Sequence, residues 1–171
     1  MSVSSYVRIR CPLEEGMARY GRWIGAPELG PPRLVPERDI FDLAFSDEQP
    51  LGLAVFVFAS DPWTVIEEVS GGLELRSTEN WLELAQDGDL VFASYNDSIA
   101  YAQLVVVERG RLVREFLQDE QDSSQDVNVG QLHEEARRRF ENWIHVMGWI
   151  EADEDKLDHP QRGWLWIHRG A

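Results

Sequence analysis

Runs of strand length lie near the start, through the middle and at the end of the chain. Residues Tyr6–Cys11 alternate between polar and apolar side chains, which is typical of a half-buried strand. The run LGLAVFVFA at 51–59 is continuously apolar, and this favours a central strand covered on both faces. Further runs of strand length lie at 63–69, 90–96, 101–108, 112–117 and 163–168. Because Arg109-Gly110 suits a tight reversal, an antiparallel meander is expected around it.

Apolar residues spaced by three or four positions predict the helices. One such stripe lies between Pro12, which suits a first helical position, and Gly25, which suits a helix end. Ser77 is expected to cap a second helix that stops around Gly88, and residues 37–45 are expected to form a short one. The longest stripe predicts a helix that packs on the sheet and ends at Gly148; its residues are Leu132, Ala136, Phe140, Trp143 and Met147.

These elements together predict an α+β fold. We expect a mostly antiparallel sheet of about six or seven strands, with two to four helices packed on one face. A chain of 171 residues has the length of one domain and can bury its own core. Residues 26–36, APELGPPRLVP, contain four prolines and no periodicity, so they predict a surface loop. The expectation is a single domain over 1–171, within which 1–50 can also be interpreted as an N-terminal extension.

The charge of the chain is strongly negative and unevenly distributed. The net charge is −15, of which residues 1–60 contribute −2 and residues 61–171 contribute −13. A field of this sign repels nucleic acid and anionic lipid, and it attracts cationic partners and speeds their association. The charge therefore argues against nucleic-acid binding and favours a basic protein partner, although acidity can also serve solubility alone.

Several chemistries lack their sequence signatures. The single cysteine, Cys11, excludes an intramolecular disulfide and a multi-cysteine zinc site. The four histidines form no H-E-x-x-H motif, and the sequence has no glycine-rich phosphate loop. The first residues form no apolar stretch of signal-peptide length, and no run approaches about 18 apolar residues. We therefore expect a cytoplasmic protein with no membrane association, no metal and no cofactor; the sequence does not indicate an oligomeric state.

The connection before the longest predicted helix is densely acidic. Seven carboxylates and no Lys or Arg lie between residues 115 and 135. Glu134 and Glu135 stand beside the expected helix start, where the helix dipole favours negative charge. The loop itself holds four carboxylates that gain no such support: Asp119, Glu120, Asp122 and Asp126. A second acidic run, EADEDKLD at 151–158, follows the same helix, so the two runs are either solvated loops or one acidic face for a basic partner.

The acidic connection has oxygen donors but lacks the residue pattern of a calcium loop. Asp122, Asp126 and Asn128 offer oxygen ligands of the kind that calcium prefers. An EF-hand loop, however, needs a glycine at its sixth position and a glutamate at its twelfth. Ser124 or Val127 stands at the sixth position, depending on where the loop is taken to begin, so the pattern does not predict a calcium site.

Glu67 is the candidate for a buried acid. In WTVIEEVS, strand alternation places Trp63 and Glu67 on the more apolar face, where a carboxylate is costly unless it is paired. Such a residue is typical of general acids, but an ion pair with an arginine or a solvated position fits the pattern equally. The pocket would be lined by Trp63, Glu67 and Asp97, together with Tyr95. Trp164 and Trp166 share one face of the last strand, as core residues or as a stacking platform for a sugar.

Three stretches carry a resemblance to known proteins. DPWTVIEEVSGGL, VFASYNDSIAYAQLVVV and GWLWIH resemble a group of small bacterial α+β proteins without an assigned role, over roughly residues 51–171. The chain is also similar, more loosely, to the acidic α+β immunity proteins that are encoded beside secreted toxins. Immunity proteins commonly block a basic nuclease by covering its active site with acidic side chains, and the resemblance implies this role here.

Two functions of different classes are therefore open. The first is a non-enzymatic acidic binding protein, namely an immunity protein that inhibits a cognate bacterial toxin. Its binding residues would be the four loop carboxylates and the aromatic anchors Tyr95 and Tyr101. The alternative is a small-molecule or carbohydrate-binding domain, or an enzyme, with a pocket around Glu67.

Overall fold

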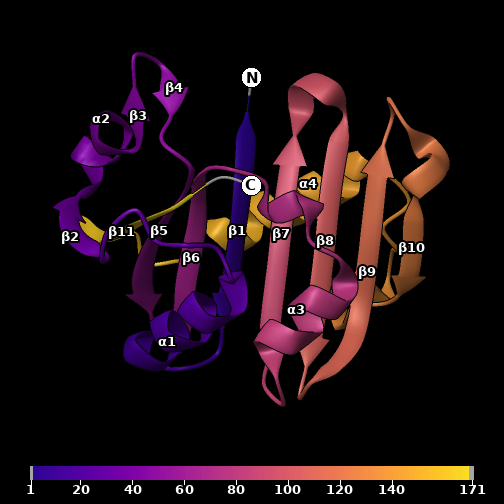
Figure 1. Ribbon diagram of the computed structural model, residues 1–171. Coiled ribbons are helices and arrows are strands. Elements are labelled where there is room, and N and C mark those ends of the chain that lie inside the picture. Colours follow the sequence, from indigo (N-terminus) through magenta and orange to yellow (C-terminus); the bar gives the residue numbers. More distant parts are fainter. Residues whose placement is uncertain (1, 170–171) are drawn as a thin grey trace. The chain divides into compact units, whose positions relative to one another are not determined.

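The computed structural model describes residues 2–169 and confirms the α+β class (Figure 1). It has four helices, within the expected range, but its main sheet has nine strands where six or seven were expected. The two additional strands, β2 and β10, are four residues long and lie in segments that the sequence predicted as loops. A run of four residues is too short to show a clear alternation, which is why the pattern missed both.

The helices are α1 (Leu13–Ile24), α2 (Ile40–Ala44), α3 (Thr78–Ala85) and α4 (Trp143–Glu154). The strands of the main sheet are β1 (Val3–Ile9), β2 (Arg33–Pro36), β5 (Leu53–Ser60), β6 (Trp63–Ser70), β7 (Leu90–Asn96), β8 (Tyr101–Glu108), β9 (Arg111–Asp119), β10 (Val127–Gly130) and β11 (Arg162–His168). A separate hairpin consists of β3 (Phe45–Ser46) and β4 (Gln49–Pro50). Among the described residues, no helix is both long and apolar enough to cross a membrane.

The chain divides into two compact units. The first unit comprises residues up to Val7 together with Arg76–Leu157, and its strands are ordered β10-β9-β8-β7-β1. The second unit comprises Arg8–Leu75 and the chain from Asp158 onward, and its strands are ordered β6-β5-β11-β2. The expectation of a single domain over 1–171 stays a prediction.

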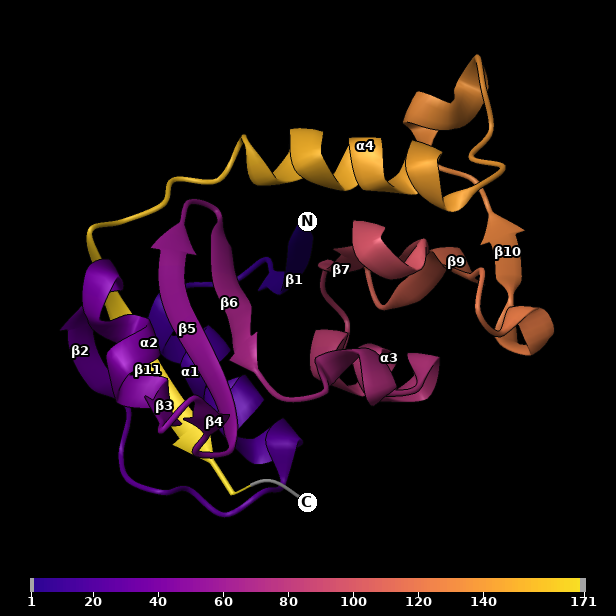
Figure 2. The same cartoon turned by 90° about the horizontal axis from the view of Figure 1, so that it is seen from above.

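Helices cover both faces of the sheet in the first unit, where the sequence predicted only one covered face. Figure 2 shows α3 and α4 on opposite sides of these strands. On one side, the Trp81 ring of α3 stacks on Phe92 of β7 with ring centroids 4.1 Å apart. On the other side, Val146 and Ile150 of α4 join the buried cluster that contains Tyr95 and Leu104. Because successive strand residues point to opposite faces, both sets of β7 residues are buried.

The long C-terminal helix begins and ends later than the sequence predicted. It begins at Trp143, after Asn142, whose side-chain oxygen accepts a hydrogen bond from the His145 amide at 3.1 Å. It continues through the exposed Gly148 to Glu154, although glycine was expected to end it. Residues His133–Ala136, which were expected within the helix, form a separate 3-10 turn (η5). The apolar spacing thus runs on through the non-helical residues 137–142, and α4 begins only after its capping residue Asn142.

Helix α1 of the second unit has the predicted bounds, and its glycines have a packing role. A Cβ atom added to Gly16 would lie 2.5 Å from the Thr64 side chain of β6, and one added to Gly21 would lie 2.6 Å from Trp166 of β11. Such distances are far below van der Waals contact, so only glycine allows the helix to approach the sheet this closely. The helix ends at Gly25, which adopts φ 63°, a left-handed conformation that favours glycine.

Part of the proline-rich segment 26–36 is a strand. Its last residues form β2, which pairs with β11 in antiparallel register, with Val35 opposite Gly163. Val35 is buried, whereas the rest of β2 is more exposed. The segment from Arg8 to Pro50 belongs to the same compact unit as β5, β6 and β11.

Candidate functional site

The acidic loop, residues 119–126, joins β9 to β10 and is closed by its own carboxylates. The Asp126 side chain accepts a hydrogen bond from the Asp119 amide at 3.1 Å, across the mouth of the loop. The Asp119 side chain in turn accepts one from the Gln121 amide at 2.9 Å. These two bonds hold the first and last carboxylates of the loop in fixed positions.

Asp122 caps the single 3-10 turn within the loop, Ser123–Gln125 (η4). Its Oδ1 accepts hydrogen bonds from the Ser124 hydroxyl at 2.6 Å and from the Ser124 amide at 3.1 Å. These donors stabilise the charged form, the hydroxyl most, and so lower the pKa of the Asp122 carboxyl. The carboxylate therefore remains ionised while it orders the turn.

Glu120 connects the acidic loop to the start of α4. Its Oε1 accepts a hydrogen bond from the Trp143 indole nitrogen at 2.9 Å. The Trp143 amide donates to Oε1 of Gln118, at the end of β9, at 2.6 Å. The first residue of α4 is thus tied both to the strand and to the loop that follows it.

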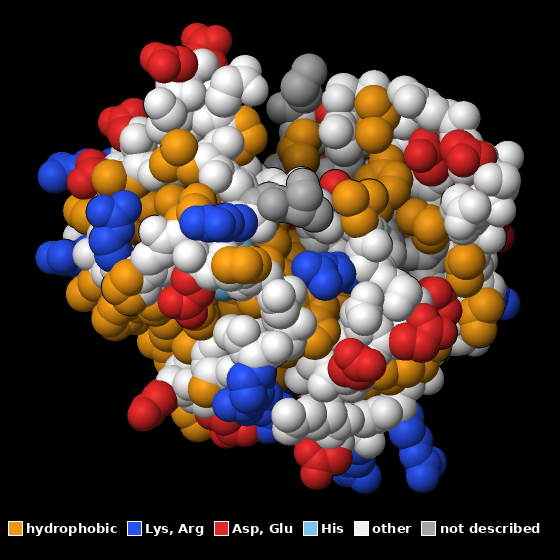
Figure 3. All heavy atoms as spheres, viewed as in Figure 1, with side chains coloured by type: hydrophobic (Ala, Val, Ile, Leu, Met, Phe, Trp, Pro, Cys, Tyr) orange, Lys and Arg blue, Asp and Glu red, His pale blue; other side chains and the backbone are white. Residues whose placement is uncertain are grey.

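The charge of the acidic loop is not neutralised by a neighbouring cation. Among residues 2–169, none of its four carboxylates forms an ion pair with an arginine or lysine. Their hydrogen-bond partners are neutral amide, hydroxyl and indole donors. Asp119 is half-buried and the other three are exposed, and Figure 3 shows acidic side chains gathered over this end of β9 and β10.

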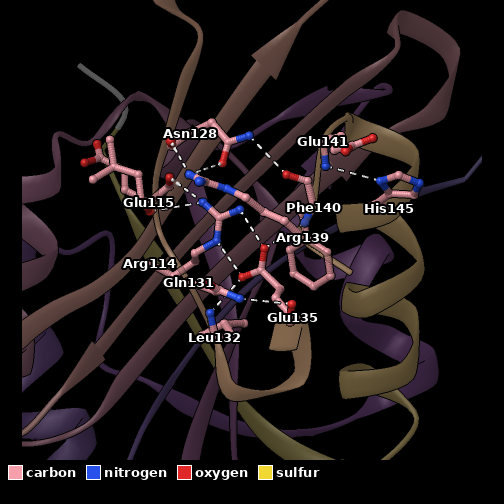
Figure 4. Close-up of polar contacts among 11 residues, drawn as sticks. Arg114, Glu115, Asn128, Gln131, Leu132, Glu135, Arg139, Phe140, Glu141 and His145 are labelled. Carbon is pink, nitrogen blue, oxygen red and sulfur yellow. Dashed lines mark hydrogen bonds and ion pairs between the residues drawn. The ribbon is translucent and has the colours of Figure 1, made fainter. Parts of the chain in front are cut away.

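Arg114 of β9 and Glu135 of η5 form a fully buried ion pair (Figure 4). Arg114 donates through Nε to Oε2 at 2.8 Å and through Nη2 to Oε1 at 3.0 Å, a bidentate arrangement. Its Nη1 donates to the backbone carbonyls of Glu115 and Val129, both at 3.0 Å. The arginine therefore joins β9, β10 and the segment that precedes α4.

The Glu135 carboxylate also orders the backbone around it. It accepts hydrogen bonds from the Leu132 amide at 2.8 Å and from the Phe140 amide at 2.7 Å. Burial acts to raise the pKa of Glu135, but the bonds from Arg114 and from these amides outweigh it, so the pKa is lowered. Glu135 lies in the first turn of a helix, as expected, but that helix is the short η5 and not the long α4, and its carboxylate accepts the Leu132 amide while it pairs with Arg114. Glu134 beside it is exposed.

The outer side of β10 is held by Arg139 and Phe140. Arg139 donates to the backbone carbonyl of Asn128 at 3.0 Å and to its side-chain oxygen at 3.4 Å. The Asn128 side-chain amide donates to the Phe140 carbonyl at 3.0 Å. The segment after η5 thus runs back along β10, as Figure 4 shows.

A shallow recess of about 130 Å³ opens between β9, β10 and the residue that follows Phe140. It is lined by Phe116, Leu117, Gln118, Asp126, Val127, Asn128 and Glu141. Asp126 belongs both to this recess and to the acidic loop. The sequence did not predict the recess, because Glu141 reaches it only through the folding back of segment 131–141.

The aromatic candidates of the first unit differ in exposure. Tyr95 is only 4% exposed, and its hydroxyl is 2.7 Å from the Ser2 hydroxyl and 3.3 Å from Oε1 of Glu151. Burial, as the largest cause, raises the pKa of Tyr95. Tyr101 is half-buried, and its hydroxyl donates to the Gln103 side chain at 2.8 Å. Tyr95 therefore offers almost no surface to a partner, whereas Tyr101 offers some.

Part of the second acidic run anchors α4 to the sheet. The Tyr6 hydroxyl donates to the buried Asp153 at 2.7 Å, and the Ser4 hydroxyl donates to Glu154 at 3.1 Å. Both donors lie on β1. These carboxylates hold the helix in place, so the run 151–158 is not simply a solvated loop.

The residues of the alternative pocket divide between the two units. In the second unit, the Arg8 guanidinium lies 4.0 Å from the centre of the Trp63 ring, and Glu67 Oε1 lies 3.2 Å from His159 Nδ1. In the first unit, Asp97 accepts a hydrogen bond from the Ser2 amide at 2.8 Å. A pocket shared by Trp63, Glu67 and Asp97 therefore stays a prediction. Of the two tryptophans on β11, Trp166 is buried and Trp164 half-buried.

The Arg114–Glu135 pair was not predicted, although the position of Arg114 in its strand indicates a buried partner. Arg114 shares a strand face with the buried Phe116, and a cation on an apolar strand face requires a carboxylate partner. The partner lies 21 residues away, so no local pattern identified it.

Comparison of the chain with protein-family models, with curated proteins and with solved structures gave no match. The resemblance to immunity proteins therefore stays a prediction.

Proposed function

We propose that this chain is a non-enzymatic acidic binding protein whose partner is a basic protein. Within that class, we propose an immunity protein that inhibits a cognate bacterial toxin. The observation that carries the proposal is the acidic loop, whose four carboxylates are ordered by neutral donors and, among residues 2–169, form no ion pair with an arginine or lysine. Carboxylates that form no ion pair within the fold remain able to pair with cationic groups of a partner.

The ordering of the acidic loop supports a role in recognition. Carboxylates that are already held in place lose less side-chain entropy when a partner binds. Complementary charge at the rim of an interface mainly accelerates association, and the effect weakens as salt is added. The half-buried Tyr101 lies on β8 opposite Asp119, so an aromatic side chain stands beside the charged loop.

The surroundings of several groups with shifted pKa values favour a binding protein over an enzyme. Glu135 is engaged in its ion pair with Arg114, and the Tyr95 hydroxyl in a hydrogen bond with Glu151. Burial raises the pKa of the Cys11 thiol, which lies beside the Thr64 side chain. Burial lowers the pKa of His168, whose ring packs against Tyr20 and Trp166. Each of these four side chains is thus surrounded by ion-pair, hydrogen-bond or ring contacts within the fold.

The decisive experiment uses the toxin encoded next to this gene in its native genome. We expect co-expression of this chain to protect cells from that toxin, and the two purified proteins to associate rapidly at low salt. The test variant combines Asp119→Asn, Glu120→Gln, Asp122→Asn and Asp126→Asn, and it should associate at least about tenfold more slowly, within the range over which electrostatic steering changes association rates.

A matched control removes the same amount of charge elsewhere. Asp42→Asn, Glu48→Gln, Glu83→Gln and Asp87→Asn neutralise four exposed carboxylates outside the acidic loop. This control should keep most of the association rate. Equal slowing in both variants would leave only a general effect of net charge, and the absence of any toxin gene or protection would contradict the proposed function.

A further inference from the structure

The recess beside the acidic loop has the size of a single side chain. Its volume of about 130 Å³ is close to that of an engineered cavity of about 150 Å³ that holds benzene. Sites for drug-sized ligands are larger, about 300–1,000 Å³. A sugar or nucleotide would therefore exceed it, whereas the end of one long side chain would fill it.

The lining of the recess combines apolar walls with acidic groups. Phe116, Leu117 and Val127 are the apolar residues that line it, and Asp126 and Glu141 are the acidic ones. One Asp126 oxygen already accepts the Asp119 amide, but a carboxylate has about four acceptor positions in all. Glu141 is exposed, and its backbone amide donates to Nδ1 of His145.

We propose that this recess receives an arginine side chain of the basic partner. The inference rests on the proposed function and deepens it by naming the group that is recognised. The methylene groups of arginine would contact the apolar walls, while the guanidinium would donate to Asp126 and Glu141. Arginine suits the recess better than lysine, because a guanidinium is more weakly hydrated and its planar donors match two acceptors at once.

Two arginines of the chain lie near the recess, and their positive charges offset part of its negative charge. Arg139 donates to Asn128, and Arg138 lies 2.9 Å from Nε2 of His145. Neither lines the recess. The two carboxylates among the lining residues and the other three of the acidic loop make five negative charges against these two positive ones.

Hydrogen bonds hold several of the residues that line the recess. Gln118 accepts the Trp143 amide, and Asn128 donates to the Phe140 carbonyl. The Arg114–Glu135 pair fixes the segment that carries Glu141, through the Phe140 amide. A side chain that enters would therefore meet a preformed site, which lowers the cost of binding.

The test uses N-acetyl-arginine amide as the probe and N-acetyl-citrulline amide, its uncharged counterpart, as the control. Amide NMR shifts of the full chain are followed during titration with each compound. We expect saturable shifts with arginine that are confined to Leu117, Val127, Asn128 and Glu141, and no saturable shift with citrulline. Glu141→Gln should weaken the binding of arginine by about two- to fivefold, the range that one exposed ion pair provides. Glu83→Gln, on α3, should leave it unchanged.

A second variant tests the recess without changing the charge. Val127→Phe should fill the space and abolish saturable binding of the arginine probe. The affinity for the toxin encoded next to this gene should fall, while the salt dependence of association is retained. Arginine shifts spread over all exposed acidic residues, or binding unaffected by Val127→Phe, would overturn the inference. That result would leave the proposed function intact, because the loop variant tests it separately. Conversely, saturable arginine binding without any toxin partner would contradict only the proposed function.

Discussion

Arg114 and Glu135 are each fully buried and face one another through two hydrogen bonds, although 21 residues of chain separate them. A buried charge is tolerated only when its partner is present, so neither residue can be changed alone without a cost. The pair joins the sheet of the first unit to the segment that leads into α4. Its carboxylate also holds the Phe140 amide, next to Glu141 of the recess.

We predict that Glu135→Gln destabilises the protein by about 3–5 kcal/mol, because it leaves the Arg114 guanidinium buried without a counter-charge. Glu134→Gln, at the exposed neighbouring position, should change the free energy of unfolding by no more than about 0.5 kcal/mol. Urea denaturation of both variants measures the difference. The double variant Arg114→Met with Glu135→Leu should recover part of the loss, and a Glu135→Gln protein of normal stability would show that the pair contributes little.

His168 should make the protein sensitive to mild acid. Burial lowers its pKa, so the unfolded chain binds a proton at a higher pH than the folded one does. Its contribution is therefore complete above the unfolded pKa of about 6.5, and stability falls as the pH drops below that value. The free energy of unfolding, measured in urea between pH 7 and pH 5, should fall more steeply for the natural protein than for His168→Phe.

The control for this prediction is His133→Gln, which changes an exposed histidine and should leave the pH dependence as it is. Phenylalanine retains a ring beside Tyr20 and Trp166, whose ring centres lie 5.5 and 5.1 Å from that of His168. Parallel curves for the natural protein and His168→Phe would mean that His168 does not titrate differently in the two states.

Neutralising the acidic loop with amides should leave the thermal midpoint unchanged or raised. Asparagine and glutamine keep a side-chain oxygen, so the acceptors for the Gln121, Ser124 and Trp143 donors remain. Repulsion among neighbouring carboxylates is removed at the same time. Asp122→Ala, in contrast, deletes an acceptor and should lower the midpoint. A large loss of stability in the amide variant would assign the loop charges a structural role.

Two helical glycines should respond in opposite directions to alanine. Gly16→Ala should destabilise the protein by about 1–3 kcal/mol, because the added methyl meets Thr64 in a packed interface. Gly148→Ala should stabilise it by up to about 1 kcal/mol, because that position in α4 is open and alanine favours a helix. Thermal melts of the two variants test the close approach of α1 to its sheet. Equal stabilisation by both would contradict it.

Elements with a strong local signal were predicted well. Pro12 and Gly25 bound α1, and Ser77 caps α3 through the Asn80 amide, as its sequence indicates. The predicted reversal at Arg109-Gly110 is present, and both residues have a positive φ. A positive φ is usual for glycine, so the sequence indicates it at Gly110 but not at Arg109. In these places a single residue type satisfies a local requirement of the backbone.

The parts that were missed depend on contacts between distant residues. The start of α4 was misplaced because the apolar spacing of 132–147 ignores Glu135, whose carboxylate turns inward to Arg114. β10 exists because it pairs with β9, and its own four residues have no strong strand pattern. The recess follows from both of these, so a candidate site that contains it could not be read from local sequence.

The position of Arg139 has a consequence for self-association. β10 is the outermost strand of the first unit, and an open strand edge can recruit the edge of another molecule. Here the edge is only four residues long, and Arg139 already occupies the Asn128 carbonyl that another chain would need. The same arginine adds a positive charge that a second chain would have to displace. An edge this short, with its Asn128 carbonyl already bonded, therefore disfavours strand-to-strand association of two molecules through β10.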